Sequence, residues 1–275
     1  MEDYSIRKPQ VAGQFYSASK EKLKAEIELL LGKERAAQKL SVIACMMPHA
    51  GYMYSGKVAA KVASLIQIKE RIILMGPNHS GYGKDFSIMT QGLWQMPFGD
   101  VSIDEELAKA LLKKSAHLEE DTLSHTYEHS LEVEIPFLQY FKPNFSIVPI
   151  TFAASELQTY KEIGREIADT LKALNLSQSV LIIASSDMTH YESQHCAEKK
   201  DKEALGAILE LDEDKLWEKI HKFNISMCGY AATIAMLTAA KLLGAKKAQL
   251  IDYQTSGDVT GDYSSVVGYA GVVIS

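Results

Sequence analysis

The stretch at residues 41–56, SVIACMMPHAGYMYSG, joins an apolar run to a loop of proline, glycine and tyrosine. Residues 41–47 are almost continuously apolar, which is typical of a strand buried on both faces of a sheet. Pro48 favours an extended Met47 and ends the strand there. A simple turn needs a proline or a glycine but no imidazole, so His49 is predicted to be presented at the edge of a sheet.

Similar apolar runs and helical patterns alternate along the rest of the chain. Further strands are expected at 71–75, 145–150, 179–184, 248–253 and 264–274. Helices are expected at 20–31, 57–67, 104–114, 156–174, 196–210 and 228–243. This alternation predicts a three-layer α/β/α sandwich with a largely parallel central sheet. The segment 84–103 alternates apolar and polar residues between Gly/Pro turns and predicts an antiparallel hairpin, so the sheet should be mixed.

Composition and charge limit the classes of function. The 275 residues contain no fixed-period repeat or linker, which predicts one domain spanning 1–275. The net charge of -6 argues against nucleic acid or an anionic membrane as the main partner. The polar N-terminus indicates no signal peptide, and no apolar run reaches the roughly 18 residues of a membrane span. Three scattered cysteines form no disulfide framework, so we expect a cytoplasmic protein.

Histidines follow three of the expected strands. They are His49, His79 in GPNHSGYG and His190 in SSDMTHY. Ligands of open α/β sheets bind outside the carboxyl ends of the strands. A single histidine in such a place is usually solvated or bonded to a carbonyl, but three equivalent ones indicate a shared site. Imidazole suits a transition metal or acid–base catalysis.

A further ligand could be a carboxylate or a thiolate. Cys228 directly precedes an apolar helical pattern, and the N-terminus of a helix favours the thiolate. The alternative is a thiol packed in the core, because cysteine is among the most buried residue types. Gly229 beside it allows close approach of the backbone. Cys45, within a strand, and Cys196, within a charged helical stretch, are expected to be structural.

The segment 124–134 concentrates histidine and glutamate. Glu128 and Glu132 are four residues apart, and on one helix face two solvated carboxylates would repel each other. We therefore expect a partner for at least one of them, such as an outer contact to an imidazole; a solvated acidic face is the alternative. The chain lacks HExxH, paired CxxC, P-loop and GxSxG motifs, which argues against several hydrolase and nucleotide-binding classes.

Taken together, these segments resemble the Memo family, named for a mediator of ErbB2-driven cell motility and also labelled AmmeMemoRadiSam system protein B. The matching segments are Arg7-Lys8-Pro9 with Ala12-Gly13-Gln14-Phe15-Tyr16, PHAGYMYSG (48–56), GPNHSGYG (76–83), EHSLEVEIPFL (128–138), SSDMTHY (185–191) and Cys228-Gly229. They keep their order from the N-terminus to the last third of the chain, which makes the resemblance far more specific than one short motif.

The resemblance implies a fold similar to the class III extradiol dioxygenases, which hold non-haem Fe(II) with two histidines and a glutamate. In Memo proteins the matching pocket has two histidines and a cysteine. Transferred by motif, the implied metal ligands are His49, His79 and Cys228. Asp187 and His190 are implied to line the same pocket as catalytic residues. Fe(II) is the implied metal, with copper as a possible substitute.

One position departs from the family pattern. Some relatives carry glutamine where this chain has Glu134 in EVEIPFL. The glutamate is expected to add a negative charge near the site.

Three functions remain compatible with these residues. The first is a metal-dependent redox enzyme on a small-molecule substrate, with His190 as acid–base and Asp187 orienting it. The second is a non-catalytic module that binds a peptide, such as a phosphotyrosine peptide, or a small acid in a vestigial pocket rimmed by tyrosines 52, 54, 82 and 191. The third is a metal-dependent hydrolase. A complete set of metal ligands with a proton carrier favours the first.

Overall fold

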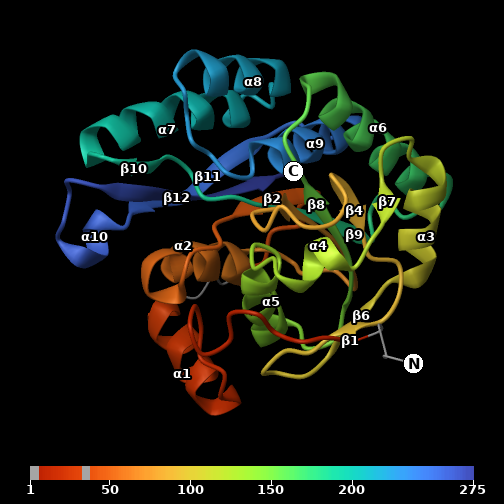
Figure 1. Cartoon of the computed structure of the whole chain (residues 1–275), viewed down its shortest axis with the longest axis horizontal. Helices are drawn as coiled ribbons and strands as arrows, with labels where there is room; N and C mark the ends of the chain where they lie inside the picture. Colours follow the sequence, from red (N-terminus) through yellow and green to blue (C-terminus); the bar gives the residue numbers. More distant parts are fainter. Residues whose placement is uncertain (1–5, 33–37) are drawn as a thin grey trace.

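A computed structural model describes residues 6–32 and 38–275 of the chain (Figure 1). Residues 1–5 of the polar N-terminal segment lie outside the described residues. Within the described part, twelve strands form one mixed sheet. The strands are β1 (Ile6–Arg7), β2 (Ala44–Met47), β3 (Arg71–Pro77), β4 (Phe86–Ile88), β5 (Leu93–Trp94), β6 (Val101–Ile103), β7 (Glu119–Glu120), β8 (Ser146–Phe152), β9 (Val180–Ser185), β10 (His190–Glu192), β11 (Ala248–Thr255) and β12 (Val266–Ile274).

The centre of the sheet is parallel and its margins are mixed. The main strand order is β1-β5-β6-β8-β3-β9-β2-β12-β10, and β11 pairs with β12. From β6 to β2 all neighbouring strands are parallel, whereas β12 is antiparallel to β2, β10 and β11. Parallel strands end at one edge of a sheet, so the loops that follow β3, β9 and β2 are neighbours.

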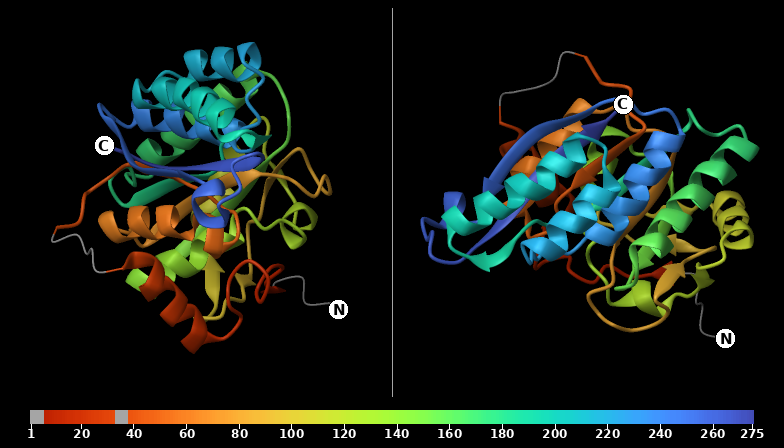
Figure 2. Two further views of the ribbon diagram at one scale, coloured as in Figure 1. Left: turned by 90° about the vertical axis from the view of Figure 1, so that its left-hand side faces the viewer. Right: turned by 90° about the horizontal axis from the view of Figure 1, so that it is seen from above.

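Helices cover both faces of the sheet. They are α1 (Lys20–Leu31), α2 (Tyr52–Leu65), α3 (Glu105–Lys114), α4 (Leu123–Thr126), α5 (Ile135–Phe141), α6 (Leu157–Ala173), α7 (Gln194–Leu209), α8 (Glu213–Lys222), α9 (Tyr230–Leu242) and α10 (Gly257–Thr260), with a 3₁₀ turn η1 (Glu132–Glu134). Figure 2 shows α1, α2 and α5 on one face and α6, α7, α8 and α9 on the other. The predicted α/β/α sandwich is confirmed.

The expected elements are observed with shifts of a few residues at their ends. The hairpin predicted within 84–103 is the antiparallel pair β5–β6, and β4 also pairs antiparallel with β8. Helix α8 was not predicted, although its sequence carries a start signal. Asp212 accepts a hydrogen bond from the backbone N–H of Lys215, which caps the first turn of α8. No helix in the described part of the chain is long and apolar enough to cross a membrane.

Helices α6 and α9 approach each other closely at Gly164. A Cβ atom at that position would lie 2.5 Å from the carbonyl oxygen of Ala235 and 2.8 Å from Cβ of Thr238 on α9. The carbonyl belongs to the backbone of a helix whose residues 231–240 are all buried against the sheet, so it cannot move aside cheaply. Absence of a side chain at Gly164 therefore sets the distance between the two helices.

We predict that Gly164→Ala lowers the free energy of unfolding by about 1–3 kcal/mol, because the added methyl group overpacks the contact between α6 and α9. Gly206→Ala on α7 is the matched control: its Cβ would meet no atom within 4 Å, and removing a glycine from a helix interior should stabilise by about 0.5–1 kcal/mol. Urea denaturation of both variants measures the difference. Stabilisation by both substitutions would contradict the packing argument.

Candidate metal centre

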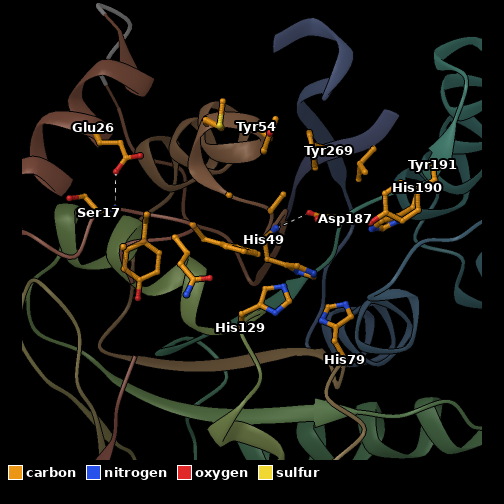
Figure 3. Close-up of a pocket in the computed structure, with 18 of the residues that line it drawn as sticks. Ser17, Glu26, His49, Tyr54, His79, His129, Asp187, His190, Tyr191 and Tyr269 are labelled. Atoms are coloured by element: carbon orange, nitrogen blue, oxygen red, sulfur yellow. Dashed lines mark hydrogen bonds between the residues drawn. The ribbon is translucent and has the colours of Figure 1, made fainter. Parts of the chain in front are cut away.

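Three adjacent strands deliver the residues of the site. His49, His79 and Asp187 each stand two residues beyond the end of a strand, namely β2, β3 and β9. Because these strands are parallel and lie side by side in the order β3-β9-β2, their carboxyl ends meet at one edge. Figure 3 shows the three side chains at the wall of one cavity. The sheet edge predicted to present His49 is thus the place where polar groups gather.

His129 completes a cluster of three imidazoles. It lies in the loop between α4 and η1, and one ring nitrogen from each of His49, His79 and His129 lies within 4.8 Å of the others. The rings of His79 and His129 stack with centroids 5.0 Å apart, and His49 meets both edge-on. Three converging imidazole nitrogens fit a transition metal by ligand type. Sequence reasoning did not assign His129; its position directly after Glu128 was the available signal.

Glu128 holds two of these histidines in place. Its Oε1 accepts hydrogen bonds from Nδ1 of His79 at 3.0 Å and from the backbone N–H groups of His129 and Ser130 at 2.9 and 2.8 Å. Its Oε2 accepts from the backbone N–H of His79. Burial opposes ionisation of Glu128, but the hydrogen bond and charge of His79 outweigh it and lower the pKa to about 2. One glutamate of segment 124–134 was expected to contact an imidazole. That glutamate is Glu128, and the imidazole is His79.

Glu132 has a different role, because the expected common helix face does not form. Helix α4 ends at Thr126, and Glu132 begins η1. Its buried carboxylate pairs with Arg7 at 2.7 Å and accepts a hydrogen bond from the hydroxyl of Tyr16 at 2.6 Å. Arg7 also donates to the carbonyl oxygen of Glu128 at 2.6 Å. The glutamate thereby fastens the N-terminal segment beside the histidine loop.

His49 is the most enclosed of the three histidines, at 2% exposure. Its backbone N–H donates to Oδ1 of Asp187 at 2.8 Å, and its Nδ1 lies 2.8 Å from Oγ of Ser185. Burial first, and then the neighbouring imidazoles, lower the pKa of His49 well below its ordinary value. For His79, burial is outweighed by Glu128, which raises the pKa. His49 is therefore neutral, the form that binds a metal.

Cys228 lies beside the cluster, at the start of α9. Its Sγ is 3.3 Å from Nε2 of His49. The group of potential ligand atoms that lie within 4.8 Å of one another comes from the three histidines and does not include this sulfur. The expectation of a favoured thiolate is wrong. Burial, followed by the charge of Asp187, raises the pKa of Cys228 despite a hydrogen bond from the Asp187 N–H. Gly229 does allow the expected close approach: a Cβ there would lie 2.3 Å from the carbonyl oxygen of Ser185.

Asp187 and His190 both line the cavity, as the resemblance implied, but they stand on different elements. Asp187 lies in the loop after β9, and His190 begins β10. Burial raises the pKa of Asp187 to about 6, against the lowering effect of the His49 N–H. Nδ1 of His190 is 2.9 Å from the carbonyl oxygen of Ser226. Since a carbonyl only accepts, Nδ1 carries a hydrogen, so the neutral form of this ring has its lone pair on Nε2.

The cavity extends well beyond the histidines, with a volume of about 990 Å³. The N-terminal loop 13–17 and α1 contribute to its wall, together with Tyr54, Tyr191 and Tyr269. Two of the tyrosines expected at its rim are elsewhere. Tyr52 is fully buried and stacks on Phe137 with centroids 4.2 Å apart.

Tyr82 is exposed, packs against Tyr127 and is not among the residues that line the cavity. Tyr191 stands at the mouth at 79% exposure, with a left-handed backbone at φ 60°. Such a conformation is unfavourable for a bulky residue. Of the four tyrosines expected at the rim, Tyr54 and Tyr191 line the cavity.

Comparisons with known proteins agree on one family. A family model described as Memo-like protein matches residues 7–273. A MEMO1 family protein of Methanopyrus kandleri is 42% identical over 279 residues, which cover 97% of this chain and 98% of that protein. Another, from Aquifex aeolicus, is 42% identical over 269 residues, covering 98% of each.

A solved structure extends the comparison to the fold alone. The crystal structure of an uncharacterized protein from Escherichia coli K12 matches with a TM-score of 0.60 at 13% sequence identity. The match covers 84% of this chain and 99% of that chain.

We predict that Glu128 makes stability sensitive to acid. A carboxyl whose pKa falls from 4.5 to about 2 on folding stabilises the protein above pH 4.5, on the order of 3 kcal/mol, and loses this contribution as the pH falls towards 2. Glu128→Gln should therefore unfold more easily at pH 7 and show a flatter stability curve between pH 4.5 and 2. Thermal unfolding across this range measures it, with the exposed Glu218→Gln as control. Parallel curves for the wild type and Glu128→Gln would refute the assignment.

Proposed function

The chain belongs to the Memo family, and we propose that it is a metal-dependent redox enzyme that acts on a small molecule at the three-histidine cluster. The observation that carries the proposal is the convergence of ring nitrogens from His49, His79 and His129 within 4.8 Å, on the wall of a cavity that also contains Asp187 and His190. Fe(II) is the first candidate metal and copper the second, because imidazole with a nearby sulfur suits both. Such a metal would supply dioxygenase-like redox chemistry with O₂.

Two ligand sets are compatible with this proposal. The set predicted from the sequence is His49, His79 and Cys228. The set indicated by the imidazole cluster is His49, His79 and His129. Sγ of Cys228 lies 3.3 Å from Nε2 of His49, the ring atom whose lone pair a metal would use. Binding at His49 would therefore break this contact and make the sulfur available as a further ligand.

Acid–base steps would fall to Asp187 and His190. The pKa of Asp187, about 6, lets the carboxyl exchange a proton near neutral pH. The lone pair on Nε2 of His190 can accept a proton from a substrate in the cavity. Asp187 is tied to the backbone of His49 and cannot move far, whereas His190 is partly exposed. We assign proton transfer with the substrate to His190 and the orienting role to Asp187.

The size of the cavity supports a second candidate function. About 990 Å³ is more than a metal and a diatomic gas require, and Tyr54 and Tyr191 offer apolar contact surface at its mouth. A non-catalytic module that binds a peptide or a small acid would use the same surface. Metal binding distinguishes the redox enzyme from the binding module, since a vestigial pocket has no need of a metal.

The cytoplasmic location and the single domain stay predictions from the sequence.

Replacing each candidate ligand should separate the two ligand sets. We expect His129→Ala to weaken anaerobic Fe(II) binding by more than the roughly 10–100-fold typical of an outer contact, as His49→Ala and His79→Ala should. Cys228→Ser should weaken it less, because the thiol proton must first be displaced. Isothermal titration measures all four, with the exposed His195→Ala as control. Wild-type affinity in His129→Ala with severe loss in Cys228→Ser would restore the ligand set predicted from the sequence.

His190→Ala should leave Fe(II) affinity nearly unchanged, because Nδ1 of this histidine is engaged with Ser226 and the residue lies outside the imidazole cluster. The rate of spectral change when O₂ is added to the Fe(II)-loaded protein with a bound substrate should fall roughly 10²–10⁴-fold. The affinity arm requires no knowledge of the substrate. A large loss of metal in this variant would make His190 a ligand instead.

A further inference from the structure

Glu134 is a buried carboxyl group with an unusual environment. It is fully buried in η1, and within the described residues its only hydrogen-bond partner is Oγ of Ser185, at 2.9 Å from Oε1. Its Oε2 is buried without a hydrogen-bond partner in the described part of the chain. An ionised carboxylate in such surroundings is strongly disfavoured. The negative charge expected at this position from the sequence is therefore absent.

The hydroxyl of Ser185 allows the protons around it to be counted. Three polar atoms surround its Oγ: the carbonyl oxygen of Ser130 at 2.7 Å, Nδ1 of His49 at 2.8 Å and Oε1 of Glu134 at 2.9 Å. A hydroxyl has one hydrogen to donate and two lone pairs that accept. The carbonyl can only accept, so it takes the hydroxyl hydrogen. The other two atoms must then be donors.

We infer that Glu134 is a positioning residue: as a neutral carboxylic acid it donates to Ser185, which in turn holds His49 in the tautomer with hydrogen on Nδ1 and the Nε2 lone pair directed at the metal cavity. The role of orienting a metal ligand rests on the proposed function. The assignment of hydrogens around Ser185 does not depend on it. Burial independently raises the pKa of Glu134 well above its ordinary value, against the lowering effect of Ser185.

His49 and His79 are thus held by chemically different partners. Nδ1 of His79 donates directly to the carboxylate of Glu128, whereas Nδ1 of His49 donates to a neutral hydroxyl supported by a neutral acid. An anionic partner increases the basicity of an imidazole, and a neutral one does not. The arrangement fixes the orientation of both rings while it keeps His49 neutral. A second carboxylate at Glu134 would instead compete with Ser130 for the hydrogen of Ser185.

Three variants test the inference. Glu134→Gln keeps the shape and offers an amide N–H donor to Ser185; Glu134→Leu removes the donor; Ser185→Ala removes the link to His49. The first readout uses protein without added metal at neutral pH. Infrared difference spectra between the wild type and Glu134→Gln should contain the carbonyl band of a protonated carboxylic acid. Nitrogen-15 NMR of labelled histidine should show His49 protonated at Nδ1 in the wild type and Glu134→Gln, and a tautomer mixture in Ser185→Ala.

The second readout is anaerobic Fe(II) affinity. We expect Glu134→Gln to bind within about twofold of the wild type, and Ser185→Ala to bind roughly 10–100-fold more weakly, as for other outer contacts of metal-bound histidine. Glu134→Leu should fall between them. Because Glu134→Gln preserves size and polarity, the comparison survives even if the leucine variant fails to fold.

Two results would overturn the inference: a carboxylate rather than a carboxylic acid signal for Glu134, or an unchanged His49 tautomer and Fe(II) affinity in Ser185→Ala. Failure of the proposed function gives a different pattern. The wild type would then bind no Fe(II), while the infrared and NMR results on protein without metal would still support or refute the proton count.

Discussion

The buried carboxylate of Glu128 is the interaction on which the geometry of the site depends. It accepts hydrogen bonds from the backbone of two loops that are far apart in the sequence, one after β3 and one before η1. A buried anion is stable only where donors surround it, so both loops must keep their positions for Glu128 to stay ionised. The same carboxylate orients the ring of His79. One side chain thus joins the edge of the sheet to the loop that supplies His129.

The site combines this anion with groups that avoid charge. His49 is neutral, Cys228 is a thiol and Glu134 is buried beside a hydroxyl. A divalent metal brings positive charge, for which Glu128 and Asp187 are the nearby compensating carboxyl groups. If every acidic group here were ionised without a cation, mutual repulsion and desolvation would work against the fold. Keeping Glu134 protonated lets the protein build a polar site in its interior without that penalty.

The sequence was sufficient to predict the parts that depend on local pattern. Apolar runs located β2, β3 and β9, and the rule for parallel sheets then brought His49, His79 and Asp187 to one edge. His129 was not predicted as a site residue, because its loop is held at the site by tertiary contacts that local sequence patterns do not reveal. The ion pair of Arg7 with Glu132 is one of these contacts. Tyr52 was expected at the rim because spacing does not reveal which side of a helix start is buried.

The ionisation of Cys228 shows where local reasoning fails most clearly. Its place before α9 predicts a favoured thiolate, yet burial and the charge of Asp187 act more strongly in the opposite direction. A dipole at a helix terminus contributes at most about 2 kcal/mol, whereas full desolvation of a charged group shifts its pKa by several units. If Cys228 served as a ligand, a bound metal would therefore have to supply enough positive charge to displace the thiol proton. His49 is already neutral and bears no such requirement, so under the proposed function it should engage a metal before Cys228 does.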